Sequence, residues 1–360
     1  MNHPILFFAD KVPPLIGGME MHGKYFIQHF QNHPIFPLLH SVTKNSKGQD
    51  VLKGTDQALD WDSFSQSISP SFVFFNSGRW IEDLETLHTL FPKAKFIYRT
   101  GGNEILKAPL ENLEIKEHTK RQGYWVKTLN AYIDTLITNS SYTEERLKAL
   151  GITCPMKKCV GGVKTSLIKE RIALFHYPVH FFCAARFVSY KNHALLIDLM
   201  HQLIIRGTQV HLSLAGDGPL LDTIQKRVQE KNLQPHVSFL GPLSGKEVFE
   251  ELSRTSFYIQ LSVDAPTEVP GGSYIHSEGM GRSILEAISA GVFIIAPPSG
   301  ALPEIITPEC GLLVNIEDME SLVSTIVSLL SSPPKQLNPT HTYDWANLFA
   351  QYEILFKELS

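Results

Sequence analysis

Apolar runs alternate with helix-like stretches along almost the whole chain. The runs before residue 160 are ILFFAD, FPLLHSV, FVFFNS, KFIYRT and TLITNS. After residue 178 the series resumes with HFFCAA, VHLSLAG, VSFLG, FYIQLS, VFIIAP and GLLVN. Strands that are apolar on both faces and separated by helices are typical of parallel sheets covered on both sides. The pattern therefore predicts an α/β protein with two doubly wound, Rossmann-like sheets.

The rhythm of strands and helices breaks once, between the two series. The stretch VKTSLIKERIALFHYP over residues 163–178 carries neither pattern, and 360 residues suit two domains. A proline-rich linker, SSPPKQLNPTH, precedes a last apolar helix whose residues need a partner to pack against. We predict a first domain of residues 1–168, completed by the helix at 341–360, and a second domain of residues 169–340.

Composition narrows the class of protein. Hydrophobic residues make up 43% and charged residues 19% of the chain, and 32 basic against 36 acidic residues give a formal net charge of -4. This balance is that of a globular protein and favours no nucleic-acid partner. The first residues lack a signal-peptide pattern, and no apolar run approaches the roughly 18 residues that span a bilayer. We expect a cytoplasmic protein, with four cysteines in no CxxC pair and therefore free thiols.

The first glycine-rich loop follows the first expected strand, in PPLIGGMEMHGKYF. Gly17 and Gly18 would let the backbone approach a ligand at a helix N-terminus, although a tight turn explains them equally well. GxGxxG is not matched, which disfavours a dinucleotide site. His22 in the first helical turn either faces a ligand or packs in the interior.

Two loops of the second half follow expected strands directly. RFVSYKN places Arg186 and Lys191 where open α/β sheets bind ligands, and two cations there suit a diphosphate. The alternative is a pair of solvated surface charges. AGDGPL places Gly216 and Asp217 after the next strand, as ligand contacts or as an ordinary turn.

The segment HSEGMGRSILEAISAG is the most specific motif in the chain. Gly281 precedes a helix expected to begin near Arg282 and Ser283, whose free amides would suit a phosphate. Glu278 and Glu286 would lie about 12 Å apart along an ideal helix, so Glu278 belongs to the loop and the two carboxylates serve different parts of one ligand. A capping box from Ser283 to Glu286 is the structural alternative. The same spacing predicts capping boxes elsewhere, at Ser141 with Glu144 and at Ser244 with Glu247.

Together these segments, from Arg186 to Glu304, resemble the retaining glycosyltransferase family four, the glycosyl transferases group 1, of the GT-B fold. RFVSYK looks like its phosphate motif, LSLAGDGPLL and VSFLG like its nucleotide-side strands, and Glu278 to Glu286 like its paired-glutamate motif. ISAGVFIIAPPSGALPEII is similar to the segment that follows that pair. The resemblance implies two Rossmann-like domains facing a central cleft, with a C-terminal helix that crosses back to the first domain.

The resemblance also implies roles for individual residues. Arg186 and Lys191 would contact the donor diphosphate and Glu278 the transferred sugar, and these three form the expected catalytic set. Glu286 would lie by the ribose hydroxyls. The remaining donor-binding candidates are Gly17, Gly18, Gly216, Asp217, Gly281, Arg282 and Ser283.

Several positions depart from the family pattern. GGVK at residues 161–164 stands where the family usually has Asn-Gly-Val-Asp. YRTGGNEI has Asn103 and Glu104 where the family often has a histidine, so these two residues and His22 are the acceptor-side candidates. An insertion at residues 263–277 forms a lid, a part of the sugar pocket or a passive loop. The DWD at residues 60–62 is discounted as a metal-binding motif, because no apolar strand delivers it to a site.

The implied function is a retaining hexosyltransferase that uses a UDP- or GDP-sugar and needs neither a metal nor another cofactor. Its acceptor would be a glycan, a lipid-linked glycan or a small molecule, and peripheral contact with the inner face of the membrane stays open. A nucleotide-sugar epimerase of similar fold and a non-catalytic nucleotide-sugar binding protein are the alternatives. The paired glutamates favour transfer over both.

Overall fold

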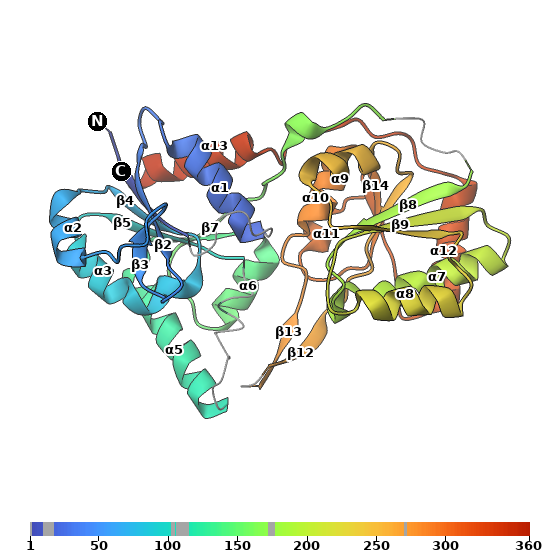
Figure 1. The fold of residues 1–360 in the computed structure, drawn as a ribbon, viewed down its shortest axis with the longest axis horizontal. Helices are drawn as coiled ribbons and strands as arrows, with labels where there is room; N and C mark the ends of the chain where they lie inside the picture. Colours follow the sequence, from blue (N-terminus) through green and yellow to red (C-terminus); the bar gives the residue numbers. More distant parts are fainter. Residues whose placement is uncertain (1, 10–17, 102–104, 106–114, 172–176, 270–271) are drawn as a thin grey trace. The chain divides into compact units, whose positions relative to one another are not determined.

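The computed structural model describes residues 2–9, 18–101, 105, 115–171, 177–269 and 272–360 (Figure 1). The chain divides into two compact units. Unit 1 comprises residues 1–162, 268–274 and 345–360, and unit 2 comprises residues 163–267 and 275–344. The sequence placed the first boundary after residue 168, whereas the contacts divide the chain after residue 162.

Unit 1 contains a seven-stranded sheet in the order β3-β2-β1-β4-β5-β6-β7. Its neighbours pair in parallel, except that β3 runs antiparallel to β2. The strands are β1 (Ile5–Phe8), β2 (Leu38–Lys44), β3 (Asp50–Leu52), β4 (Phe72–Phe75), β5 (Lys95–Arg99), β6 (Thr135–Thr138) and β7 (Met156–Lys158). Every residue of β1, β4 and β6 is buried, as strands covered on both faces require.

Successive residues of β1 enter two different cores of unit 1. Leu6 and Phe8 pack in the core that includes residues of α3, α5 and α6, whereas Ile5 and Phe7 pack in the core that includes α1 and α13. The helices are α1 (Gly18–Phe30), α2 (Trp61–Ser67), α3 (Leu84–Leu90), α5 (Ile115–Tyr132), α6 (Ser141–Ala149) and α13 (Trp345–Leu359). The last helix, α13, lies beside α1 (Figure 1), which confirms that the final helix crosses back to the first half.

Unit 2 contains a six-stranded parallel sheet in the order β10-β9-β8-β11-β14-β15. Its strands are β8 (Val179–Ala184), β9 (Val210–Ala215), β10 (Val237–Gly241), β11 (Phe257–Ile259), β14 (Phe293–Ala296) and β15 (Gly311–Leu313). Its helices are α7 (His193–Ile205), α8 (Leu221–Glu230), α9 (Gly245–Leu252), α10 (Arg282–Ser289), α11 (Leu302–Ile305) and α12 (Met319–Ser331). Short 3-10 turns cover Gly78–Asp83, Thr165–Leu167 and Ser189–Lys191.

A two-stranded sheet of β12 (Ala265–Val269) and β13 (Gly272–His276) accounts for most of the insertion at residues 263–277. All eleven apolar runs singled out in the sequence contain strands, whereas β3, β7, β12 and β13 were not expected. Among the helices that the structure describes, none is both long and apolar enough to cross a lipid bilayer.

Of the three expected capping boxes, one is confirmed and two are wrong. Ser244 and Glu247 form the box at the start of α9. Helix α6 is capped one residue earlier than expected, because the Ser140 hydroxyl accepts the amide of Thr143. Helix α10 has no side-chain cap at all: Gly281, with φ 68°, leads into it, and the hydroxyl of Ser283 donates to Gln260 instead.

Candidate functional site

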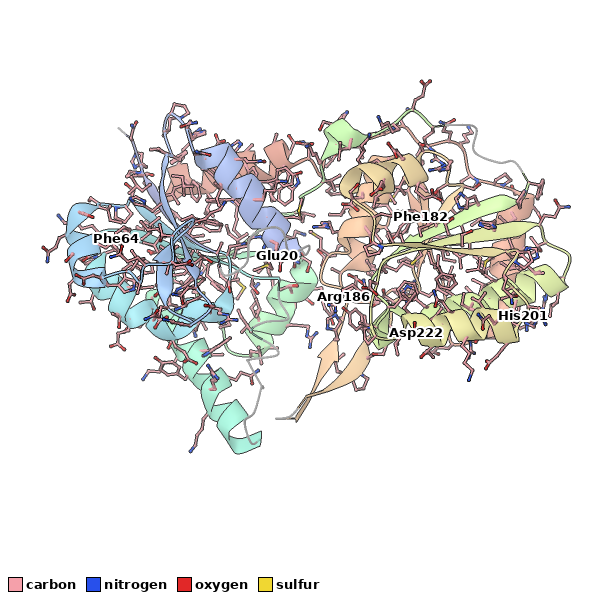
Figure 2. All side chains as sticks on the ribbon, viewed as in Figure 1. Glu20, Phe64, Phe182, Arg186, His201 and Asp222 are labelled. Carbon is pink, nitrogen blue, oxygen red and sulfur yellow. The ribbon has the colours of Figure 1, made fainter. Side chains whose placement is uncertain are left out.

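The polar residues of unit 2 gather where the strand order changes direction. β8 is the first strand of the unit, β9 and β10 follow on one side of it, and β11, β14 and β15 follow on the other. Ligands of open α/β sheets bind outside the carboxyl ends of the strands at such a switch point. The loops that begin at Ala185, after β8, and at Gln260, after β11, therefore define the candidate site. Arg186 is exposed in the first of them, beyond the end of β8 (Figure 2).

The AGDGPL turn supports the loop that carries Arg186. A Cβ atom at Gly216 would lie 2.2 Å from the carbonyl oxygen of Ala185, and one at Gly218 would lie 2.6 Å from that of Phe187. The amide of Phe187 donates to the carbonyl of Asp217 at 3.0 Å. These glycines therefore have a structural cause, the close approach of two backbones, and Gly216 and Asp217 need not touch a ligand to matter.

Lys191 and Glu278 form the central ion pair of the site. The Lys191 Nζ lies 2.5 Å from Oε2 of Glu278, and the two side chains are only 13% and 11% exposed. Gln260 Nε2 and Ser262 Oγ donate to the same carboxylate oxygen at 3.1 and 3.2 Å. Burial by itself would raise the pKa of Glu278, but Lys191 and the hydrogen bond from Ser262 outweigh it, so the pKa lies below its ordinary value.

The two oxygens of the Glu278 carboxylate are used unequally. All three donors bind Oε2, and Oε1 accepts no hydrogen bond from any residue that the structure describes. A carboxylate held ionised by three donors acts as an acceptor rather than as an acid. Its free oxygen is therefore available to accept a hydroxyl hydrogen of a ligand.

Tyr190 and His276 flank this ion pair. Their rings stack with centroids 3.7 Å apart and an interplanar angle of 28°. Tyr190 is held by the amide of Val263, which donates to its carbonyl oxygen at 2.8 Å, and Lys191 Nζ lies 5.6 Å from its ring centroid. The sequence analysis missed both residues, although Tyr190 stands inside the RFVSYK motif and His276 stands two positions before Glu278.

The N-terminus of helix α10 is linked to this pair through Gln260, which bonds both Glu278 and Ser283. It begins at Arg282 after Gly281, and no side chain caps its first turn in the described structure. The first amides of a helix have no partner within the helix and carry the positive end of its dipole, so they attract anions. The expected helix start near Arg282 and Ser283 is confirmed.

Glu286 lies one turn further along α10 and does not take part in capping. It is the fifth residue of the helix, whereas a capping box uses the third, so the structural alternative is wrong. Its Oε1 lies 3.7 Å from Nε of Arg282, and the Glu286 side chain is 15% exposed. Burial raises the pKa of Glu286 more than Arg282 lowers it.

The acceptor-side candidates give a different picture. His22 is fully buried, and its Nε2 lies 3.0 Å from the hydroxyl of Tyr352 on α13. This corrects the expectation that His22 faces a ligand, because the returning helix α13 covers it. Burial lowers the pKa of His22 well below its usual range. Gly18 is the exposed first residue of α1, whereas Gly17, Asn103 and Glu104 lie outside the described residues.

Asp60 has a local role that accounts for its place in DWD. It caps helix α2, because its carboxylate accepts the amide of Asp62 at 3.2 Å and the hydroxyl of Ser63 at 2.6 Å. Gly162, in the run that departs from the family pattern, packs against the last helix: a Cβ there would lie 3.0 Å from the Trp345 ring.

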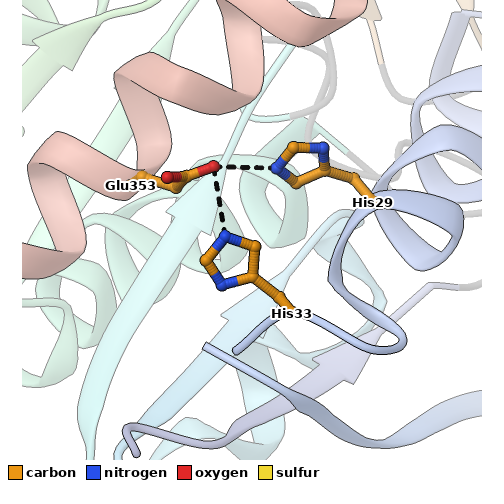
Figure 3. Close-up of side chains that lie close together, drawn as sticks. All are labelled: His29, His33 and Glu353. Atoms are coloured by element: carbon orange, nitrogen blue, oxygen red, sulfur yellow. Dashed lines mark hydrogen bonds and ion pairs between the residues drawn. The ribbon is translucent and has the colours of Figure 1, made fainter. Parts of the chain in front are cut away.

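A cluster of metal-ligand side chains joins α1 to α13 in unit 1 (Figure 3). Nε2 of His29 and Nε2 of His33 lie 2.9 and 3.4 Å from Oε1 of Glu353. Nδ1 of His33, however, accepts the amide of Phe36 at 3.0 Å, so the proton of the neutral ring sits on Nε2. A metal-bound histidine needs that nitrogen unprotonated. The hydrogen bonds therefore favour a contact between two helices over a metal site.

Comparison with known proteins gives one family and several relatives. Residues 166–341 match the family described as Glycosyl transferases group 1. The chain is 26% identical over 252 residues to a Corynebacterium glutamicum protein named GDP-mannose-dependent monoacylated alpha-(1-6)-phosphatidylinositol monomannoside mannosyltransferase. That match covers 67% of this chain and 62% of the relative, so the chain spans less than two thirds of the relative's length.

Solved structures of similar fold cover nearly the whole chain. The sucrose-phosphate synthase of Thermosynechococcus elongatus matches with a TM-score of 0.73 and 16% identity over 99% of both chains. Anabaena HepE, in complex with UDP and glucose, matches with a TM-score of 0.66 and 16% identity over 99% of this chain and 95% of its own. At this identity the likeness concerns the fold, and it confirms the GT-B class of two doubly wound halves.

Proposed function

We propose, because residues 166–341 match the family described as Glycosyl transferases group 1, that this chain moves a hexosyl group from a nucleotide-diphosphate sugar to an acceptor. The observation that carries the proposal is the state of Glu278. Its carboxylate is anchored through one oxygen by Lys191, Gln260 and Ser262, and its other oxygen is open to a hydroxyl of the transferred sugar. The pKa of Glu278 lies below its ordinary value, which suits a hydroxyl acceptor and not a proton donor.

The cations of the site fit the departing phosphate. When the bond between sugar and diphosphate breaks, negative charge develops on the phosphate, and preorganised positive groups lower the barrier. Lys191, Arg186 and the positive N-terminal end of the α10 dipole would meet that charge. The chemistry then needs no divalent cation, and Glu286 on the same helix would accept the ribose hydroxyls. Retention of configuration follows from the family and belongs to the proposal.

The relatives suggest the class of donor and acceptor. The Corynebacterium relative is named as GDP-mannose-dependent and as acting on a phosphatidylinositol mannoside, and HepE was solved with UDP and glucose. We propose a GDP- or UDP-sugar donor and a sugar, glycan or lipid-linked acceptor. A cytoplasmic enzyme that meets a lipid-linked acceptor through peripheral contact with the inner face of the membrane fits this choice.

A ligand panel and a turnover assay test the proposal. GDP, UDP, GDP-mannose and UDP-glucose are added one at a time, because a ligand that binds only the folded state raises its apparent stability. The stabilising donor is then incubated with mannoside and glucoside acceptors, with and without EDTA, and the products are analysed for the anomeric configuration. We expect transfer with retention that EDTA leaves unchanged.

The same assay separates the alternatives. Free epimerised sugar without an acceptor product would indicate the epimerase, and tight binding without turnover would indicate a binding protein. Loss of turnover in EDTA with recovery in magnesium would contradict the metal-independent chemistry.

A further inference from the structure

A buried amide connects the two ends of the candidate site. Gln260 follows β11 directly and is 0% exposed. Its Nε2 donates to Oε2 of Glu278 at 3.1 Å and to the Ser262 hydroxyl at 2.9 Å. Its Oε1 lies 3.2 Å from the Ser283 hydroxyl and 3.1 Å from the Tyr258 hydroxyl, both of which donate to it. The amide thus has partners for both its hydrogens and both its lone pairs.

The orientation of this amide is determined by its neighbours. An ionised carboxylate only accepts hydrogen bonds, so the nitrogen of Gln260, and not its oxygen, must face Glu278. The oxygen then faces Ser283, the second residue of α10. The Tyr258 hydroxyl accepts the amide of Ala184 at 3.3 Å, which ties the same group to the end of β8.

We propose that Gln260 is a positioning residue: it holds Glu278 with Oε2 anchored and Oε1 turned outward, and it couples that carboxylate to the first turn of α10. The inference rests on the proposed function, in which Glu278 meets the sugar and α10 meets the phosphate. Gln260 is fully buried, so it would act on a ligand indirectly, through Glu278 and α10. Phosphate binding at α10 and the orientation of Glu278 are then parts of one hydrogen-bonded unit.

The opposing account is that Gln260 only satisfies buried polar groups. That account predicts a loss of stability on substitution and no specific kinetic signature. A matched control is Ser213 on β9, which is 4% exposed and whose hydroxyl lies 2.8 Å from Nε2 of His180, outside the site. Ser213→Ala removes one buried hydrogen bond from the same sheet.

The experiment compares Gln260→Leu and Gln260→Glu with Ser213→Ala. Leucine removes all of the hydrogen bonds, and glutamate replaces the donor to Glu278 by a second carboxylate. We expect the Kd of the nucleoside diphosphate to stay within about threefold and kcat to fall about 10- to 100-fold in Gln260→Leu. The acid limb of the pH–rate profile should move to higher pH in both Gln260 variants, and further in Gln260→Glu, because Glu278 loses a donor that favours its ionised form.

A carbon-13 NMR titration of the Glu278 carboxyl measures the change in its pKa directly, without turnover. The Glu278 signal is assigned by its absence in Glu278→Gln. If Gln260→Leu does not fold, Gln260→Met, which keeps the unbranched length, takes its place. A Glu278 titration that does not move in the Gln260 variants, or a kcat that falls no more than in Ser213→Ala, overturns the proposal. A wild-type chain that neither binds nucleotide nor turns over contradicts the proposed function instead, while the titration still decides the role of Gln260.

Discussion

The two sheets of this protein have the same kind of strand order, but the polar side chains near them make different contacts. In each sheet the first strand lies in the interior and its buried neighbours run parallel to it. In unit 2, Glu278 keeps one carboxylate oxygen free of the described residues, and the first turn of α10 has no side-chain cap. In unit 1, His22 is fully buried and its ring lies in contact with the hydroxyl of Tyr352 on α13. A shared strand order therefore does not by itself determine how the polar residues near the strand ends are used.

The polar side chains at the strand ends of unit 1 largely satisfy one another. Arg99, the last residue of β5, donates to Oδ1 of Asn76 at 3.2 Å, and Nδ2 of Asn76 donates to the carbonyl of Met19 at 3.0 Å. Asn76 is only 2% exposed. These groups link β4, β5 and α1, so we interpret them as support for the end of the sheet.

Of the changes considered, Lys191→Ala should have the largest effect, because it removes the central ion pair of the candidate site in unit 2. The change removes a cation from the proposed phosphate site and leaves Glu278 buried without its counter-ion. Removing one partner of a buried ion pair typically destabilises a protein by roughly 3–5 kcal/mol. We expect transfer to fall about 100-fold or more, measured as kcat/KM for the donor. Lys246→Ala is the control, since Lys246 is 67% exposed and, among the described residues, forms its ion pair with Glu250 along α9. Equal kcat/KM values for the two variants would show that Lys191 does not contribute to the donor site.

Gly216→Ala should cost unit 2 about 3 kcal/mol or more in free energy of unfolding. The added methyl group meets the Ala185 carbonyl oxygen at 2.2 Å, at a residue with φ 132°, so the backbone must move. Gly123→Ala in α5 of unit 1 is the counterpart, because nothing lies within 4 Å of its Cβ position. That helical change should stabilise by up to about 1 kcal/mol. Urea unfolding of both variants measures the contrast, and a neutral Gly216→Ala would contradict the close approach.

Acidification should weaken both units through one buried histidine in each. Burial lowers the pKa of His22 well below its usual range, and burial with a smaller effect of Lys191 lowers that of His193 to about 4. The unfolded chain takes up these protons near pH 6.5, so between about pH 6.5 and 4 it binds more protons than the folded chain, and stability falls as the pH is lowered. His193 accounts for at most about 3 kcal/mol of the free energy of unfolding that is lost on acidification.

Urea unfolding of the wild type and of His193→Phe at pH 7, 6, 5 and 4 checks this dependence. Phenylalanine keeps the stacking on Phe187, whose ring centroid lies 4.2 Å from that of His193. The variant should lose less stability on acidification than the wild type. Parallel curves would show that His193 takes up its proton in the folded state.

Glu286→Gln should have the smallest effect, and it distinguishes ligand binding by Glu286 from a purely structural role in α10. Glutamine replaces a charged acceptor by a neutral one, and charge-assisted hydrogen bonds are about twice as strong as neutral ones. We expect nucleotide affinity to fall several-fold while the melting temperature of the unliganded protein stays nearly constant. A lower melting temperature with intact affinity would instead mean that Glu286 supports only the fold.

The strand pattern was predictable from sequence, whereas the finer parts of the site were not. Buried parallel strands leave long apolar runs, and all eleven such runs contain strands. Strand β3 lies at the sheet edge with only Val51 buried, so it lacks that signal, and the inserted strands β12 and β13 do not form long apolar runs. Glu278 and Lys191 stand in motifs, and the structure brings them together, but nothing in their spacing states that Gln260 joins them.

The error over His22 has the same origin as the missed role of Gln260. Its partner Tyr352 stands 330 positions away in the sequence, so no local pattern could show that α13 covers it. Glu286 was ambiguous because capping and ligand binding use the same spacing, and only the start of α10 after Gly281 separates them. Contacts across the fold, and not residue types, decided each of these cases.

The return of α13 also sets an order of events during synthesis of the chain. The core of unit 1 that contains Phe26 and Phe74 is completed by Phe349 and Phe356, which leave the ribosome only after all of unit 2. Unit 2 is contiguous apart from residues 268–274 and has its own core, so it can fold while the nascent first unit still exposes aromatic surface. Translation would therefore finish the second half of the protein before the first.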